Sequence, residues 1–240
     1  MKRSTVAESV ARDVSRRVKR GTRCHVYGSA KNPGLTIAAE SFLERNVGYL
    51  LELDPRIRSY REQPFTLELE TGERLPSRKD FVARPGLTPR FYTPDFLCGL
   101  ADGVELVLEV KNQARLEQER MRLQEAACVL QQRGMRLVTL TEEQFTPVLV
   151  ANARLLNAVS APYLQDRLEP ALEALNRAAA ERTCWTSGEL AQTTSLDRFG
   201  VAVAVVHGIF SADLAVDVFA PDTLLRAGLG DLSHLEILPL

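Results

Sequence analysis

The chain has 240 residues, enough for one large domain or two small ones. Hydrophobic residues make up 45% of it and charged residues 25%, which is ordinary for a globular protein, and no apolar run reaches the length of a membrane span or forms a signal peptide. The four cysteines are scattered without metal-ligand spacing, which argues against a zinc site, so we expect a cytoplasmic protein with reduced thiols.

The net charge of −1 hides an uneven distribution of charge along the chain. Lysine and arginine dominate before position 32, acids dominate beyond position 150, and no lysine follows Lys111. Because phosphate contacts dominate the affinity of proteins for nucleic acids, we expect the first half to meet double-stranded DNA and the acidic end to meet protein.

Residues 1–31 are predicted to form a basic N-terminal arm, a helix followed by a loop. Valine recurs at regular helical spacing from Val6 to Val18, which gives an apolar stripe surrounded by arginines. The stripe is compatible with a helix packed on the rest of the protein and with an arm that contacts DNA. The candidate DNA contacts are four bases of this arm: Arg16, Arg17, Lys19 and Arg20.

Residues 32–147 carry alternating helical and strand patterns. Hydrophobic spacing predicts these elements in order: a helix over 41–55, strands over 57–64 and 65–69, strand-like segments over 90–97 and 104–111, a helix over 115–133 ended by Gly134, a strand over 136–140 and a short helix from 141. The buried side of the long helix is predicted to be Leu116, Met121, Leu123, Ala127 and Leu130. This αβββαβ order predicts an α/β fold, with a small mixed sheet flanked by helices.

The strand-like segments 90–97 and 104–111 each carry a carboxylate, Asp95 and Glu109. An Asp-Gly pair between them is a strong hairpin signal, and the midpoint between the two acids falls in that turn. An antiparallel hairpin therefore places Asp95 opposite Glu109 to within a residue. Side chains alternate along a strand, so Lys111 shares a face with Glu109. The other face is predicted to hold Val104, Leu106, Leu108 and Val110.

Two acids and a lysine in one cleft match the needs of metal-dependent phosphodiester hydrolysis. Mg²⁺ prefers oxygen ligands and activates water, and Mn²⁺ is expected to substitute for it. Asp95 and Glu109 would supply two oxygens and the backbone carbonyl of Val110 a third. Lys111 cannot bind a cation, so it would orient or deprotonate the attacking water, or hold the scissile phosphate. In the structural alternative, Asp95 is a turn residue, and Glu109 and Lys111 lie on a solvated strand face.

Pro94-Asp95 followed by Glu109-Val110-Lys111 resembles the motif of the PD-(D/E)xK nuclease superfamily. Further motifs occur around it in a fixed order: a helix carrying Ser41-x-x-Glu44, a Leu-Glu-x-Asp-Pro exit, a strand ending in Glu-Gln-Pro, Tyr-Thr-Pro-Asp-Phe, and Glu-Val-Lys. Over about residues 35–145 this ordered set resembles the TnsA family of transposon-end endonucleases. The resemblance implies a restriction-endonuclease-like sheet.

The resemblance also implies further site residues and partners. A glutamate on the first helix joins the metal site in that family, and Glu44 matches its position; Glu40, one turn earlier on the same face, is the competing candidate. Either is a solvated helix charge in the structural alternative. Gln63 matches a family position too, for which we expect a structural role. The family cleaves the 5′ strands at transposon ends during cut-and-paste transposition, beside a DDE transposase and an AAA+ regulator.

Residues 148–240 are predicted to form a helical connector, broken near Pro162 and Pro170, and a C-terminal winged-helix-like domain. The domain pattern comprises a helix over 185–191 with Ser187 as its N-cap, a helix over 197–209, strands with a turn over 211–219, and a closing segment over 221–225. The second helix carries few bases, which favours docking to protein over reading of DNA.

Two other functions are compatible with the sequence. A restriction or repair endonuclease of the same superfamily would share the site but lack the transposase partners. A non-catalytic DNA-binding adaptor would keep the fold alone, and the intact set of Asp95, Glu109 and Lys111 argues against it.

Overall fold

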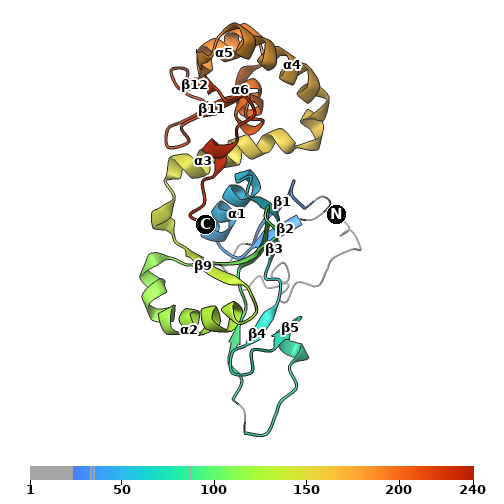
Figure 1. Cartoon of the computed structure of the whole chain (residues 1–240), viewed down its shortest axis with the longest axis vertical. Helices are drawn as coiled ribbons and strands as arrows, with labels where there is room; N and C mark the ends of the chain where they lie inside the picture. Colours follow the sequence, from blue (N-terminus) through green and yellow to red (C-terminus); the bar gives the residue numbers. More distant parts are fainter. Residues whose placement is uncertain (1–23, 33, 35, 87) are drawn as a thin grey trace. The chain divides into compact units, whose positions relative to one another are not determined.

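The structure, a computed structural model, describes residues 24–32, 34, 36–86 and 88–240 (Figure 1). It divides into two compact units. The first contains the described residues before Tyr49, residues 56–144 and Leu240, and the second contains residues 49–55 and 145–239. The four candidate DNA contacts of the N-terminal arm lie outside the described residues. Among the helices that the structure describes, none is long and apolar enough to cross a membrane.

The first unit is built on a four-stranded mixed sheet. Its strands, in spatial order, are β3 (Ile57–Glu62), β7 (Phe96–Leu100), β8 (Glu105–Val110) and β9 (Arg136–Leu140). The β3–β7 and β7–β8 pairs are antiparallel, whereas β8 and β9 are parallel and are joined through α2 (Gln113–Gln131). With α1 (Phe42–Leu53) preceding β3 in the chain, this order confirms the predicted αβββαβ arrangement and the α/β class.

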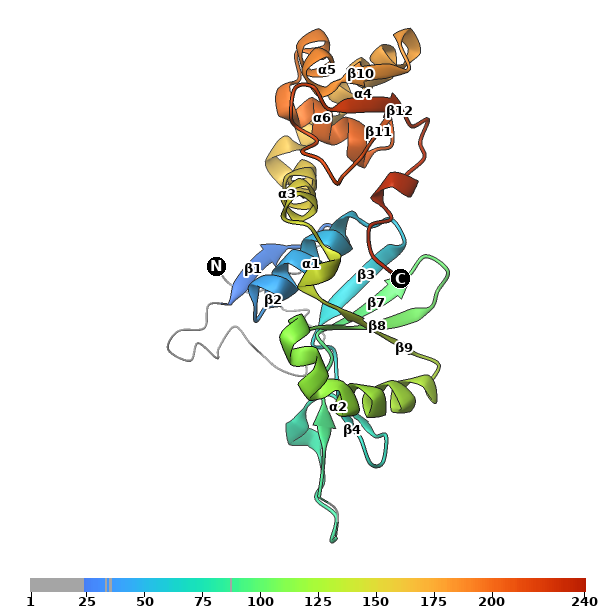
Figure 2. The same cartoon turned by 90° about the vertical axis from the view of Figure 1, so that its left-hand side faces the viewer.

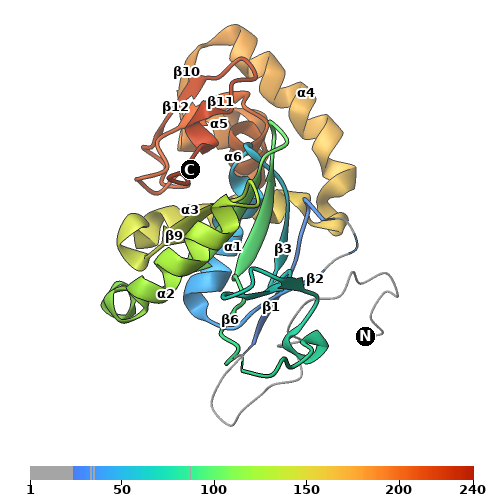
Figure 3. The same ribbon diagram turned by 60° about the horizontal axis from the view of Figure 1, so that its bottom comes forward.

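Helix α2 covers one face of this sheet (Figure 2, Figure 3). Its buried residues Leu123, Ala126 and Leu130 pack in one cluster with Leu97 of β7 and Val107 of β8. Fully burying a leucine or valine contributes about 1.5–3 kcal/mol, so this cluster is a main source of stability for the unit.

Two predictions about buried residues of this unit were wrong. Met121 is 75% exposed, because the sheet covers α2 on one side only and Met121 points away from it. Val104 is also exposed, since it precedes β8 and belongs to the turn. The predicted end of α2 at Gly134 is confirmed: Gly134 takes a left-handed φ of 73°, and the Met135 N–H donates to the Leu130 carbonyl.

A second, smaller sheet of the first unit has the order β5 (Arg74–Leu75), β4 (Thr66–Glu68), β6 (Phe91–Tyr92). The predicted single segment 90–97 is thus two strands in two sheets, because β6 pairs with β4 whereas β7 pairs with β3 and β8. Pro94 lies at the break, where it lacks the N–H that a continuous strand would need.

The small sheet is fixed by a buried carboxylate. Glu68 accepts hydrogen bonds from the backbone N–H groups of Arg90, Glu70 and Thr71, at 3.0, 3.1 and 2.7 Å. It thereby ties the turn after β4 to the start of β6, which places Arg90 and Phe91 beside α2.

The predicted loop of the N-terminal arm was wrong in its described part. Residues 24–31 include the strand β1 (His25–Gly28), which pairs antiparallel with β2 (Thr36–Ala39). The strand pattern was too short to detect, since only alternate residues of β1 are partly buried.

The second unit consists of helices and a three-stranded antiparallel sheet of order β10-β12-β11. Its elements in chain order are α3 (Pro147–Leu156), the 3-10 turns η4 (Asn157–Ser160) and η5 (Pro162–Leu164), α4 (Gln165–Glu181), β10 (Cys184–Thr186), α5 (Ser187–Thr194), α6 (Asp197–Val206), β11 (Phe210–Ala212) and β12 (Leu224–Ala227). The predicted break near Pro162 is confirmed, since Pro162 opens η5 between α3 and α4.

The predicted break at Pro170 was wrong, because Pro170 lies inside α4. Proline removes one helical hydrogen bond, and the carbonyl that would accept it belongs to Asp166, which is exposed and can bind water instead. Ser187 is not the N-cap of α5 either. Thr186 and Glu189 form a reciprocal capping box, and the buried Ser187 hydroxyl donates to the Val218 carbonyl at 2.7 Å.

Of the strands predicted over 211–219, the first corresponds to β11, whereas the second was placed too early. Asp213 and Asp217 accept hydrogen bonds from Ala215 N–H and Phe219 N–H, so residues 213–219 form turns instead of a second strand. The strand partner lies later, in β12, and β10 escaped detection because it has only three residues.

Candidate active site

The hairpin of β7 and β8 brings the two predicted carboxylates together. In its register Phe96 pairs with Leu108, so Asp95 and Glu109 are the next opposed positions. The Val110 N–H donates to Asp95 Oδ2 at 2.8 Å, which fixes the Asp95 side chain against the end of β8. The predicted opposition of the two acids is therefore observed in the geometry of the hairpin.

Glu109 is held on both of its oxygens. It is only 3% exposed; its Oε2 accepts a hydrogen bond from the Tyr92 hydroxyl at 2.8 Å, and its Oε1 lies 2.5 Å from Lys111 Nζ. Lys111 Nζ also lies 3.7 Å from Asp95 Oδ2. The Lys111 N–H donates to the Leu140 carbonyl at 3.0 Å, so the parallel strand β9 holds the backbone that carries the lysine. One ammonium group thus faces both carboxylates.

Burial and like charge dominate the electrostatics of this cluster. Burial raises the pKa of Asp95 well above its usual range, the negative charge of Glu109 raises it further, and Lys111 lowers it. Burial lowers the pKa of Lys111, but the charges of Asp95 and Glu109 outweigh it and raise that pKa. The acids therefore outnumber the positive charge available to them, and Lys111 is held protonated between them.

Glu44 lies near enough to act on this cluster but has a second role. Burial raises its pKa, and its charge in turn raises the pKa of Asp95. Its Oε1 accepts from the Ser41 hydroxyl at 2.8 Å and its Oε2 from the Glu40 N–H at 2.8 Å, while the Ser41 hydroxyl accepts from the Glu44 N–H. Ser41-x-x-Glu44 thus caps α1. The backbone N–H of the competing candidate, Glu40, belongs to the same cap.

The donor chemistry of the cluster fits a hard divalent cation. Within the described part of the chain, no three His, Cys, Asp or Glu side chains already stand as a group that could hold a metal ion. Asp95 and Glu109 are nevertheless paired on one hairpin, and Lys111 is within reach of both. Carboxylate oxygens are the ligands that Mg²⁺ and Mn²⁺ prefer, and a divalent cation would relieve the repulsion that raises the pKa of Asp95.

Two further residues lie beside the cluster: Tyr92, which the sequence analysis missed, and Gln63, for which it expected only a structural role. Tyr92 is buried, and the charge of Glu109 adds to burial in raising its pKa, so it remains a hydroxyl donor to Glu109. Its position in β6, three residues before Asp95, was visible, but which way it points depends on the break at Pro94.

Gln63 has an unusual conformation for a residue with a side chain. Its φ is 42°, in the left-handed region, and it is only 5% exposed. Its backbone N–H donates to the Asp95 carbonyl at 2.9 Å, whereas its side-chain Oε1 accepts no hydrogen bond within the part of the chain that the structure describes. Strain and an unpaired buried amide oxygen thus occur next to the candidate catalytic acid.

Residues 54–142 match the family described as TnsA-like endonuclease N terminal. This segment is similar to TnsA-like endonucleases. The match includes Gln63, Asp95, Glu109 and Lys111 and thus confirms the resemblance predicted from the motifs, while Glu44 lies before the matched segment. No curated protein sequence matches the chain. The matched segment contains every strand of the first unit from β3 to β9, so Asp95, Glu109 and Lys111 lie within it.

Proposed function

We propose that the protein is a divalent-metal-dependent DNA endonuclease that cleaves the 5′ strands at transposon ends during cut-and-paste transposition. In this proposal it acts beside a DDE transposase and an AAA+ regulator, with Mg²⁺ as the physiological ion and Mn²⁺ as a substitute. The match of residues 54–142 to TnsA-like endonucleases supports a transposon-associated nuclease.

The observation that carries the proposal is the charge arrangement of Asp95, Glu109 and Lys111. Two carboxylates are opposed across a hairpin with one ammonium between them, at 2.5 and 3.7 Å from their oxygens. Placing two acids side by side in a mostly buried site destabilises the fold, so a structural role alone gives no reason for the arrangement. The solvated strand face of the structural alternative is also at odds with the burial of Glu109.

Each residue has a distinct task in this proposal. A bound divalent cation would supply Lewis-acid charge and lower the pKa of a water molecule. Asp95 and Glu109 would hold the cation, with Glu44 and the Val110 carbonyl as further oxygen ligands. Tyr92 would keep Glu109 oriented by its hydrogen bond. Lys111, attracted less strongly once the carboxylates are neutralised, would orient the attacking water or hold the scissile phosphate.

For the chain as a whole we propose a basic N-terminal arm over 1–31, a nuclease domain over 32–147, and a helical connector with a winged-helix-like domain over 148–240. Three helices, α4 to α6, with the sheet β10-β12-β11 support a winged-helix-like unit. Phe199–Val205 of α6 are all buried, so the helix that would read DNA offers little surface, which supports docking to protein. The arm residues Arg16, Arg17, Lys19 and Arg20 are proposed to contact DNA.

A plasmid-nicking assay tests the proposal. The full chain, alone and with the transposase and regulator encoded beside it, is incubated with supercoiled plasmid carrying transposon ends, with Mg²⁺, Mn²⁺ or a chelator. We expect metal-dependent nicking that Lys111→Ala abolishes. Wild-type protein that leaves such plasmids intact with both metals and all partners contradicts the proposal, and favours the adaptor. Nicking at restriction-like sites without partners favours the restriction or repair nuclease.

A further inference from the structure

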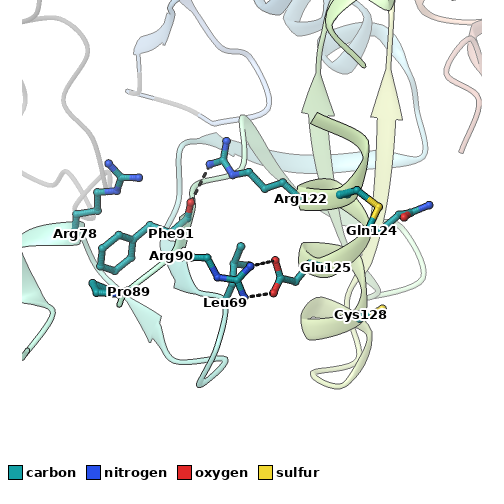
Figure 4. A pocket seen from close by; sticks show the side chains of 10 residues that line it. Leu69, Arg78, Pro89, Arg90, Phe91, Arg122, Gln124, Glu125 and Cys128 are labelled. Atoms are coloured by element: carbon teal, nitrogen blue, oxygen red, sulfur yellow. Dashed lines mark hydrogen bonds and ion pairs between the residues drawn. The ribbon is translucent and has the colours of Figure 1, made fainter. Parts of the chain in front are cut away.

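A groove of about 1020 Å³ lies in the first unit between β6 and α2. Three arginines and one carboxylate line it: Arg78, Arg90, Arg122 and Glu125. Leu69, Pro89, Phe91 and Met121 contribute apolar surface to the lining. Figure 4 shows that Arg78, Arg90 and Phe91 come from the side of the small sheet, while Arg122 and Glu125 project from α2.

The arginines of this groove are held by contacts that leave some of their guanidinium N–H groups available. Arg90 forms two hydrogen bonds to the carboxylate of Glu125, and Arg122 donates to the Phe91 carbonyl at 2.9 Å. The guanidinium of Arg78 lies 5.0 Å from the centre of the Phe91 ring, which orients it without occupying its N–H groups. Each guanidinium has five N–H donors, so these contacts leave N–H groups on all three that can bind an anion.

The groove and the candidate active site lie on either side of the buried Tyr92. Tyr92 follows Phe91 in β6 and donates its hydroxyl to Glu109. Arg122 lines the groove and also lies over the Tyr92 ring, with 5.9 Å from its guanidinium carbon to the ring centre. Arg122 and Glu109 thus contact the same residue, so a polyanion bound along the arginines would lie beside the candidate site.

We propose that this groove binds the sugar–phosphate backbone of the DNA strand beside the scissile phosphate. Guanidinium groups match phosphate oxygens in charge and in planar geometry, and the three arginines of the lining outnumber its one side-chain amide, Gln124. The proposal deepens the proposed function, on which it rests, because it names the surface that holds the substrate next to the cleavage site. The predicted N-terminal arm is then a second DNA contact.

Glu125 provides a specific test of the proposal, because a DNA phosphate would replace its carboxylate as the partner of Arg90. The Arg90–Glu125 pair is exposed, with 57% and 32% of the two side chains accessible, and such pairs contribute little to stability. In the free protein Glu125 keeps the Arg90 fork ordered; on DNA binding it competes with phosphate. Removing its charge should therefore strengthen DNA binding, whereas a purely structural pair predicts no gain.

The test measures DNA binding by the full chain with a chelator present, so that cleavage does not intervene. The anisotropy of a labelled DNA duplex is followed at several salt concentrations for Arg78→Gln, for Arg78→Gln with Arg90→Gln, for Glu125→Gln and for wild type. Arg177→Gln is the matched control, since Arg177 is exposed on α4 in the second unit. Thermal unfolding checks that each variant folds.

We expect the arginine variants to bind more weakly, by about tenfold for the double variant. The dependence of log affinity on log salt should become shallower by about 0.9 for each phosphate that the variant no longer neutralises. Glu125→Gln should bind severalfold more tightly, and Arg177→Gln should match wild type.

Any other pattern, such as equal weakening in the groove and control variants or no gain in Glu125→Gln, overturns the inference. If wild type fails to nick DNA but the expected binding pattern holds, the proposed function fails and the groove stands. If wild type nicks DNA and the binding pattern is absent, only the groove fails.

Discussion

Asn152 of the second unit and Gln63 of the first each bury a side-chain amide, and these two amides differ in how well their hydrogen bonds are satisfied. Asn152 of α3, 2% exposed, donates to the Leu214 and Val216 carbonyls at 3.0 and 2.7 Å and accepts from the Val218 N–H at 3.2 Å. Gln63 of the first unit has a left-handed backbone and an unpaired Oε1. A fully paired buried amide fixes a loop, whereas an unpaired one lowers stability and needs another explanation.

The same contrast holds for charge. The buried carboxylate of the second unit, Asp54, accepts a hydrogen bond from the Leu238 N–H at 3.1 Å, whereas the first unit opposes Asp95 to Glu109 across a hairpin. Burying like charges together destabilises a fold, and such arrangements concentrate at functional sites. Unfavourable polar burial, more than polar burial itself, therefore distinguishes the candidate active site from the rest of the described structure.

The largest effect is expected at the opposed carboxylates. Asp95→Ala or Glu109→Ala should reduce the nicking rate by about three orders of magnitude or more, because each removes an oxygen ligand of the ion that activates water. Asp95→Asn should also abolish nicking while keeping or raising the melting temperature, since it relieves repulsion from Glu109. Nicking rates and thermal unfolding are measured on the same preparations. Near wild-type nicking by Asp95→Ala would contradict the assignment of the site.

In the second unit, a substitution at the buried amide Asn152 should lower stability and leave nicking unchanged, the opposite of the effect expected at Asp95. Asn152→Ala leaves two carbonyls and one N–H without partners, and each unsatisfied buried group costs about 1–3 kcal/mol, so we expect the free energy of unfolding to fall by about 3 kcal/mol or more. Chemical denaturation followed by fluorescence measures this change. The nicking rate per folded molecule should stay near wild type. An Asn152→Ala protein as stable as wild type would contradict the claim that this paired amide stabilises the second unit.

Gln63 tests the contrast within the first unit. Gln63→Leu keeps the volume of the side chain but removes the unpaired oxygen, so stability should be unchanged or higher by about 1 kcal/mol. Gln63→Leu keeps the backbone N–H that donates to Asp95, so it isolates the side-chain oxygen. Nicking should fall about tenfold, with the decrease in kcat and not in KM, if that oxygen takes part in the site. Gln63→Glu serves as the conservative comparison. Reduced stability with an unchanged nicking rate would make Gln63 a structural residue, as the sequence suggested.

How far the sequence predicted these features depended on how local their signals are. The opposition of Asp95 and Glu109 follows from a turn at Asp102-Gly103 and strict alternation, and both hold within one hairpin. Tyr92 and Gln63 have no such local signal. The orientation of Tyr92 depends on the pairing of β6 with β4, and the strain at Gln63 depends on a hydrogen bond to Asp95 across the sheet.

The second unit shows the same limit in its strands. The helices α5 and α6 were predicted from the sequence, although Thr186 and not Ser187 is the N-cap of α5, and α4 was wrongly expected to break at Pro170. The short strands β10 and β12 were missed or misplaced, because their register is set by partners far along the chain. The role of Glu44 could not be decided from the sequence either, because the pattern Ser41-x-x-Glu44 is compatible with a helix cap and with a site residue.

The smallest effect concerns the dependence of stability on pH. Burial and Glu109 raise the pKa of Asp95 above its value in the unfolded chain, so the folded protein binds more protons than the unfolded chain once pH exceeds the ordinary value of 3.8. The contribution of Asp95 to stability is therefore full below that value and is lost as pH rises through the raised pKa.

With a chelator present, Asp95→Asn should remove this pH-dependent destabilisation. We expect the stability of Asp95→Asn relative to wild type to increase as pH rises from below 4 toward neutral, as measured by denaturant unfolding at each pH. A difference that is constant or shrinks over this range would mean that Asp95 is not destabilised by its surroundings, and the charge argument for the site would have no support.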